Sequence, residues 1–268
     1  MTLTTPINAQ HAVRNARRSL WRGTVVRVMT LVLAAVGIVI ESGMGQPTLG
    51  GLLLLAAIAM WVLLSVRTVK NQQSILRVGL LLEARQFEQA EQTLARAIDS
   101  FSLYKPPVIQ ALQNLTAMRY AQNQFNDVRT LANELLQYKA PPAAHRPTRL
   151  MLADAALRLD DLPTAFYQLS LVQAAGAMPL REQLKNTELQ VEYCVRLGAW
   201  AQALEYLPWK LEVADLLPAP ASARFQSMLA VASHNIGRND WQAWFERRIT
   251  LMTPAQFATN QESVTATT

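Results

Sequence analysis

The sequence predicts an all-α protein in which an N-terminal transmembrane helical hairpin precedes an α-solenoid of about five helical hairpins. Three observations support this fold class. Residues 49–66 form an apolar run without charge, large apolar residues recur further along at intervals of 37 to 41 residues, and only 10 of 268 residues are glycine. Charged residues make up 16% of the chain, whereas roughly 25% is usual in soluble domains, so part of the chain is expected to avoid water.

Basic residues are concentrated near the N-terminus. Residues 1–70 contain seven Lys and Arg side chains against one Glu, and residues 71–268 contain 18 basic and 18 acidic side chains, so the first part accounts for the whole net charge of +6. A nucleic-acid-binding protein normally carries its positive charge on the folded domain. Here the charges flank apolar runs, a pattern that indicates a membrane anchor and speaks against nucleic acid as a partner.

The clearest membrane segment is the run LGGLLLLAAIAMWVLLSV at residues 49–66. As a helix these 18 residues would extend about 27 Å, close to the thickness of the hydrocarbon core. Trp61 lies near the C-terminal end, and Arg67 and Lys70 follow, as expected at a membrane interface. A core helix of a soluble protein would need a polar stripe, which this run lacks, so we predict that it spans a membrane.

The preceding apolar segment, from Val28 to Ile40, has 13 residues and is open to three interpretations. It reaches about 17 residues, enough for a spanning helix, if it begins at Thr24 and Arg27 snorkels to the interface. It also resembles the apolar core of a signal peptide, because Gly43, Met44 and Gly45 form a small-x-small site, and it is short enough for a re-entrant segment. The long preceding segment and the second apolar run favour a spanning helix.

These segments predict a basic cytoplasmic tail at residues 1–24 and two transmembrane helices within residues 25–66, joined by a short turn at about 41–48. The turn contains no Lys or Arg, so both chain ends are expected in the cytoplasm of a bacterial inner-membrane protein. Small residues on the two helices would let them pack closely; on the first they are Ala34, Ala35 and Gly37, and on the second Gly50, Gly51, Ala56, Ala57 and Ala59.

From residue 72 to about 250 the sequence repeats. Five short blocks each contain a polar or glycine turn, a large apolar residue and, three places on, a mostly small residue. The large residues are Phe87, Phe125, Leu162, Trp200 and Trp241. A period of this length is typical of helical hairpins stacked as a solenoid. Because residues 72–268 are net neutral and carry their own apolar repeat, we expect them to fold without the membrane helices. Residues 251–268, rich in Thr, Gln and Asn, are expected to be a disordered tail.

The repeat resembles the tetratricopeptide repeat (TPR) family, whose second helices begin with an aromatic residue, followed by alanine three places on and by further apolar residues. The corresponding positions are Phe87, Ala90, Leu94, Ala97; Phe125, Val128, Ala132, Leu135; Leu162, Ala165, Leu169, Val172; and Trp200, Ala203, Leu207. The resemblance is poor for the first helices, where Gly79 alone matches. In layout, two membrane helices before such repeats also resemble the HemY family of bacterial inner-membrane proteins, which implies an accessory role in a porphyrin-related membrane pathway. The basic tail at residues 1–24 departs from that layout.

No motif in the sequence indicates an active site, so we predict that the chain is not an enzyme and holds no metal or cofactor. The histidines, at positions 11, 145 and 234, lack metal-ligand spacing. Cys194 lies in an apolar helical pattern typical of a packed thiol, and Asp160 with Asp161 fits a turn and helix N-cap. Trp241, Trp244 and Phe245 form either an aromatic docking patch or, as their spacing favours, the core of the terminal hairpin.

The expected function is therefore that of a membrane-anchored scaffold or adaptor that binds a protein partner, either a peptide segment or a subunit of a membrane complex. In TPR-like arrays the first helices line a concave groove that binds such segments. Counting back from the second helices, the groove would include Asn114, Met118, Met151, Arg158, Asn186, Tyr193 and Arg196.

The charge bias predicts the topology directly. A reporter fused after Thr268 should be active only in an assay for cytoplasmic location, because basic residues precede the first membrane helix and follow the second. Paired cytoplasmic and periplasmic reporters at the same site make the measurement. Periplasmic activity would contradict the hairpin topology and favour the signal-peptide interpretation.

Overall fold

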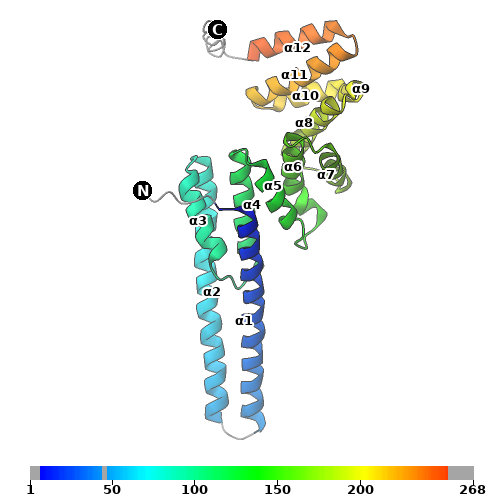
Figure 1. Ribbon diagram of the computed structural model, residues 1–268. Helices are drawn as coiled ribbons and strands as arrows, with labels where there is room; N and C mark the ends of the chain where they lie inside the picture. Colours follow the sequence, from blue (N-terminus) through cyan, green and yellow to red (C-terminus); the bar gives the residue numbers. More distant parts are fainter. Residues whose placement is uncertain (1–6, 44–46, 253–268) are drawn as a thin grey trace. The chain divides into compact units, whose positions relative to one another are not determined.

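The computed structural model describes residues 7–43 and 47–252, and every regular element in those residues is an α-helix (Figure 1). The all-α prediction is confirmed. The expected turn at about 41–48 falls partly outside the described residues, and the expected disordered tail at 251–268 almost entirely. The helices are α1 Ala9–Gly43, α2 Pro47–Glu83, α3 Phe87–Asp99, α4 Lys105–Ala121, α5 Phe125–Leu135, α6 Pro142–Arg158, α7 Leu162–Ala174, α8 Leu180–Leu197, α9 Trp200–Ala203, α10 Leu207–Leu216, α11 Ala219–Asn235 and α12 Asn239–Met252.

The chain divides into two compact units, with the boundary between Lys139 and Ala140. The N-terminal unit contains α1 to α5, and the C-terminal unit contains α6 to α12. In the described residues, α1 and α2 form one hairpin, and five further hairpins pair α2 with α3, α4 with α5, α6 with α7, α8 with α9, and α11 with α12.

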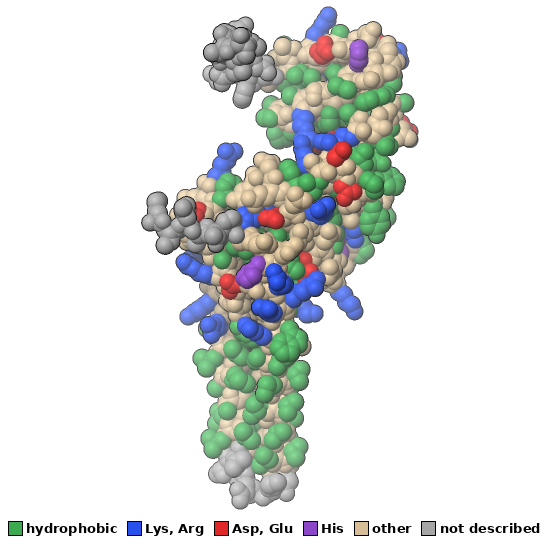
Figure 2. Space-filling model, in the orientation of Figure 1, with side chains coloured by type: hydrophobic (Ala, Val, Ile, Leu, Met, Phe, Trp, Pro, Cys, Tyr) green, Lys and Arg blue, Asp and Glu red, His purple; other side chains and the backbone are tan. Residues whose placement is uncertain are grey.

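The two N-terminal helices are long and apolar enough to cross a membrane. The most apolar windows of α1 and α2 have mean hydropathies of 2.3 and 2.2, and few of the residues in these windows are buried. Outward side chains such as Leu31 and Leu63 are exposed, and Figure 2 shows an apolar surface without charges over this part of the hairpin. The 35 residues of α1 extend about 52 Å, well beyond the roughly 30 Å hydrocarbon core, so part of each helix continues into the rest of the N-terminal unit.

Small side chains form the inward face of α1 along almost its whole length. Its buried positions recur every three, four or seven residues, as in the seam of two packed helices. They are Ala9, Ala12, Ala16, Ser19, Gly23, Thr30 and Gly37. On α2, Gly50 and Ala57 are buried on the facing side, and a Cβ atom on Gly37 would lie 3.2 Å from the Gly50 carbonyl oxygen. The helices therefore approach as closely as their backbones allow.

The first half of α1 is part of the folded N-terminal unit and not a separate basic tail. Ala9, Ala12 and Ala16 belong to one buried core together with side chains of α2, α3, α4 and α5. The arginines of residues 1–24 are prominent in the sequence, but the alanines between them are the residues that enter this core. A fragment of residues 72–268 would therefore lack one wall of the N-terminal core, and the expectation that it folds alone stays a prediction.

The buried Arg119 of α4 ties the start of α1 to this core. The Arg119 side chain is 1% exposed, and its Nη2 donates to the Ile7 carbonyl at 2.8 Å and to Glu91 Oε1 of α3 at 2.5 Å. The Ile7 N–H donates to the same Glu91 oxygen at 2.6 Å. Since an unpaired buried charge costs several kcal/mol, the three groups hold one another in place.

A second ion pair fixes α1 against α5. Arg17 donates from Nε and Nη2 to the two oxygens of the buried Glu134 carboxylate, at 2.9 and 2.5 Å. The Tyr138 hydroxyl donates to Glu134 Oε1 at 3.2 Å. Burial, with the Glu134 carboxylate beside it, raises the pKa of Tyr138 to about 12, so the hydroxyl stays a donor at physiological pH.

Each of the five hairpins from α2 to α12 turns through a residue in the left-handed backbone region, followed by a backbone N–H that donates to the carbonyl five residues earlier. This is the Schellman arrangement that ends helices. The left-handed residues are Arg85, Asn123, Asp160, Gly198 and Gly237, at spacings of 38, 37, 38 and 39 residues. The next helix begins two residues later, at Phe87, Phe125, Leu162, Trp200 and Asn239.

The fourth hairpin departs from this repeat. Its second helix, α9, has only four residues, and the chain turns again at Tyr206, whose φ is 54°. Pro208 follows, and because proline lacks an N–H it cannot continue the hydrogen bonding of α9. The repeat pattern predicted one helix that contains both Trp200 and Leu207, whereas Leu207 begins a separate helix, α10.

The aromatic cluster near the C-terminus is divided between core and surface. Phe245 is buried in the core of the last hairpins, and Trp241 is partly buried against it. Trp244 is 43% exposed and lies under the guanidinium of Arg248, 4.8 Å from the ring centroid. The core interpretation therefore holds for Phe245 and not for Trp244.

Gly23 provides a direct test of α1 as part of the N-terminal unit. A Cβ atom there would lie 2.4 Å from the Ser102 carbonyl oxygen, whereas at Gly79 of α2 it would meet nothing within 4 Å. Both are helical glycines, so helix propensity favours alanine by about 0.5–1 kcal/mol at each. We expect Gly79→Ala to stabilise the full chain, and Gly23→Ala to destabilise it by about 1–3 kcal/mol through overpacking.

Thermal unfolding of both variants in one detergent, followed by circular dichroism, makes this comparison. Equal stabilisation by the two substitutions would mean that the segment joining α3 and α4 does not pack on α1.

Candidate functional site

The structure separates the seven residues predicted to line the groove. Asn114 and Met118 lie on α4 in the N-terminal unit, where Met118 is fully buried and the Asn114 amide donates to the Ile75 carbonyl of α2 at 3.1 Å. Their assignment to a groove is wrong, because the face of α4 on which they lie packs against α2 and belongs to the core that α1 completes.

The other five residues lie in the C-terminal unit and differ in their burial and partners. Asn186 of α8 is buried, and its Oδ1 has no hydrogen-bond partner among the described residues. Met151 of α6 is half-buried. Arg158 and Arg196 take part in ion pairs, and Tyr193 lines a separate groove.

Arg158 belongs to a row of paired charges that crosses the first helices of the C-terminal hairpins. It lies 3.2 Å from the fully buried Asp154 of α6, and Lys185 of α8 lies 2.8 Å from the other oxygen of that carboxylate. Lys185 also donates to the buried Glu188 at 3.0 Å. One buried acid thus joins α6 to α8.

The row continues from α8 to α11 through Glu192. Arg196 Nη2 donates to Glu192 Oε1 at 3.1 Å, and Arg224 Nη2 of α11 donates to Glu192 Oε2 at 2.5 Å. Arg196 also lies 3.8 Å from Asp160, and Arg224 lies 3.7 Å from Glu188.

The charges of this row cancel. It contains four acidic and four basic side chains: Asp154, Asp160, Glu188, Glu192, Arg158, Lys185, Arg196 and Arg224. Removing one partner of such a pair would leave a buried charge without compensation. The two arginines that the sequence assigned to partner binding are therefore already paired within the unit, and Lys185 and Arg224 make the ion pairs between α6, α8 and α11.

An aromatic groove of about 530 Å³ lies between α7, α8 and α10 of the same unit. Phe166 and Tyr206 form part of its lining and are 58% and 75% exposed, so aromatic surface is open at the groove. The Phe166 and Tyr193 rings lie 5.7 Å apart at 31°. The full lining is Phe166, Leu169, Ser170, Gln173, Thr187, Gln190, Val191, Tyr193, Cys194, Gln202, Glu205, Tyr206, Trp209 and Lys210.

The break in the fourth hairpin creates this groove. The left-handed Tyr206 and the proline at 208 turn the chain, so that Trp209 and Lys210 return toward α8 and α9. Lys210 Nζ donates to the carbonyls of Gln202 and Ala203, at 3.1 and 2.9 Å, and so satisfies the exposed end of α9. Burial lowers the pKa of Lys210, which is consistent with a side chain held against the protein.

The polar part of the lining is rich in amides and nearly neutral in charge. Gln173, Gln190 and Gln202 can each donate and accept hydrogen bonds, as the backbone of an extended peptide requires. The only charged side chains of the lining are Glu205 and Lys210, which cancel. Burial raises the pKa of the Cys194 thiol, which favours its protonated form at neutral pH.

Of the residues that line this groove, Tyr193 was predicted from the sequence and the others were not. The available signal was a set of aromatic residues outside the core positions of the repeat, at 166, 206 and 209. Within residues 7–43 and 47–252, no three His, Cys, Asp or Glu side chains are grouped as metal ligands. Comparison with family models, curated proteins and solved structures gave no significant match to this chain.

The charged row should contribute to stability through its buried acids. We expect Glu192→Gln to lower the free energy of unfolding by about 1–3 kcal/mol, because Arg196 and Arg224 lose a charged acceptor. Glu212→Gln, on the exposed surface of α10, should change it by less than about 0.5 kcal/mol. Urea unfolding of the full chain in detergent measures both, and equal effects would mean that the row contributes no specific stability.

Proposed function

We propose that this chain is a membrane-anchored adaptor built from TPR-like hairpins, whose C-terminal unit captures an extended segment of a protein partner in the aromatic groove. The observation that carries the proposal is the groove itself, with large aromatic side chains left exposed beside three glutamines. Grooves that bind peptides combine apolar pockets for side chains with hydrogen-bonding groups for the backbone.

The composition of the groove supports a particular kind of segment. Phe166 and Tyr206 offer broad, rigid surfaces that a bulky apolar side chain can cover at little cost in conformational entropy. Because Glu205 and Lys210 cancel, the lining does not select an acidic or a basic peptide. The proposed ligand is therefore an uncharged segment with one or more aromatic or large aliphatic side chains.

The repeat geometry supports the TPR-like assignment. The turns occur every 37 to 39 residues, and small residues at the positions predicted for second helices, such as Ala90, Ala132 and Ala165, are buried between helices. The binding site we propose differs from the groove inferred from the sequence, because the charges of Arg158 and Arg196 are already paired within the unit.

The anchor is proposed to be the α1–α2 hairpin, with both chain ends on the cytoplasmic side of a bacterial inner membrane. Figure 2 supports this, since basic side chains gather where the apolar part of the hairpin meets the rest of the N-terminal unit. Basic residues at membrane borders favour the cytoplasmic side.

Two adjacent aromatic residues of α7 allow a matched test of the groove. Phe166 lines the groove and Tyr167 does not, although their side chains are almost equally exposed, at 58% and 59%. The full chain in detergent is panned against a random peptide library, and the affinity of the enriched peptides is measured by fluorescence anisotropy. We expect uncharged, aromatic-containing peptides, with binding weakened at least tenfold by Phe166→Ala and unchanged by Tyr167→Ala.

Tyr206→Asn offers a second variant that preserves the fold, because asparagine tolerates the left-handed backbone at this position. It should weaken the same peptides. Enrichment of strongly charged peptides, or equal binding by both α7 variants, would place the function outside this groove.

A further inference from the structure

The segment that joins α3 to α4 lies across both membrane helices at one level. On α1 it passes so close that a Cβ atom on Gly23 would meet the Ser102 carbonyl oxygen. On α2, the Thr68 hydroxyl accepts a hydrogen bond from the Leu103 N–H at 3.1 Å. Gly23, Thr68 and the joining segment therefore share one plane across the hairpin.

This plane is the border between charged and apolar surface. Toward the α1–α2 turn, the outward side chains are apolar from Val28 on α1 and up to Val66 on α2. In the other direction α1 carries Arg22 and Arg18. Val28 is six positions after Arg22, about 9 Å along a helix, so the arginine side chain is within reach of a headgroup layer about 5–8 Å thick.

Aromatic side chains lie at the same level. Trp21 is 69% exposed beside Arg22, and Tyr104 is 38% exposed at the end of the joining segment. Trp and Tyr are enriched where membrane proteins meet lipid headgroups, because their rings are amphipathic.

A polar pocket of about 220 Å³ opens at this border, between α1 and the end of α3. Arg18 and Arg22, one helical turn apart, are its basic members. Neither makes a hydrogen bond or an ion pair with any described residue, unlike Arg17 on the adjacent face, which is held by Glu134. The lining is completed by Asn15, Ser19, Asp99, Ser100 and Phe101.

The other polar groups of the pocket are already engaged with one another. Asp99, its one acid, accepts a hydrogen bond from the Asn15 amide at 2.6 Å. The Ser19 hydroxyl donates to the Ser100 carbonyl at 3.1 Å. The pocket thus has an excess of one positive charge, and its two guanidinium groups remain available to a ligand.

We infer that this pocket binds the phosphate group of an anionic phospholipid, in the leaflet that faces the basic side of the hairpin. Guanidinium groups match phosphate oxygens in geometry and retain their charge at all physiological pH values. The exposed apolar side chains that begin at Val28 would continue along the acyl chains of the same lipid, a contact that a free phosphate ion lacks. The inference rests on the membrane anchoring proposed above.

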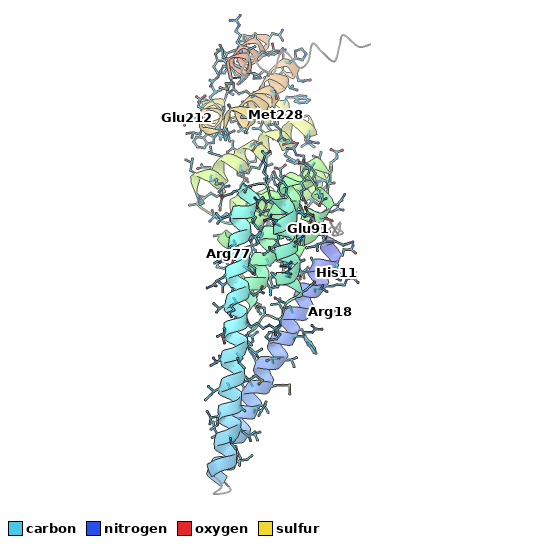
Figure 3. The ribbon with its side chains drawn as sticks, turned by 90° about the vertical axis from the view of Figure 1, so that its left-hand side faces the viewer. His11, Arg18, Arg77, Glu91, Glu212 and Met228 are labelled. Carbon is cyan, nitrogen blue, oxygen red and sulfur yellow. The ribbon has the colours of Figure 1, made fainter. Side chains whose placement is uncertain are left out.

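The test compares two double variants with the same loss of charge. Arg18→Gln with Arg22→Gln changes the pocket. Arg77→Gln with Arg129→Gln removes two exposed arginines of the same unit that do not line it, and Figure 3 shows Arg77 farther than Arg18 from the α1–α2 turn. Each full-length protein is purified in detergent, stripped of lipid and titrated with phosphatidylglycerol or phosphatidylcholine, and bound lipids are counted by native mass spectrometry.

We expect the native chain to retain one phosphatidylglycerol more tightly than phosphatidylcholine. The pocket variant should bind it about thirtyfold more weakly, because each cation removed weakens binding about fivefold. The control variant should behave as the native chain does. Inorganic phosphate at millimolar concentration should not displace the lipid.

Three results would overturn the inference: equal binding by the two variants, no preference for phosphatidylglycerol, or displacement by inorganic phosphate, which would indicate a site for the free ion. The peptide-binding proposal is tested separately, because Phe166 and Tyr206 are unchanged in both double variants. Retained peptide binding alongside lost lipid selectivity, or the reverse, identifies which of the two proposals fails.

Discussion

The close approach of α1 and α2 is the contact on which the N-terminal unit depends. Gly37 lies against the Gly50 backbone near the turn, and at the other end Ala9 and Ala16 pack into the core of the first hairpins. Because these side chains are small along one face, a single straight helix serves both as half of an apolar hairpin and as one wall of a folded unit. Larger residues on this face would separate the helices and open the core at the same time.

This constraint also explains where the charges lie. An α1 helix that packs through alanine and glycine must place its arginines on its other faces, where Arg17 reaches α5 and Arg18 and Arg22 reach the border of the apolar surface. The buried Arg119 closes the unit by binding the start of α1. The C-terminal unit is built differently, since its first helices are joined by paired charges around Asp154 and Glu192.

Local signals in the sequence predicted the local features. The helices that begin at Phe87, Phe125 and Leu162 could be located because an aromatic or large aliphatic residue follows a turn, and that pattern needs no knowledge of the rest of the chain. The role of α1 could not be predicted in this way, because alanines between arginines carry little apolar signal. Burial of Met118 and Asn186 depends on which helix covers each face, which a repeat register alone does not determine.

The aromatic groove lies where the repeat is interrupted. In a regular hairpin, the second helix that begins at Trp200 would continue beyond position 206. Residues 206, 209 and 210 would then lie on that same helix. The left-handed Tyr206 and the proline after it instead end α9 after one turn and bring Trp209 and Lys210 to the edge of α8. The four regular hairpins provide packing, and the irregular segment after α9 provides exposed aromatic surface. Functional surface in a repeat protein of this kind is therefore best sought at the residues that the repeat does not explain.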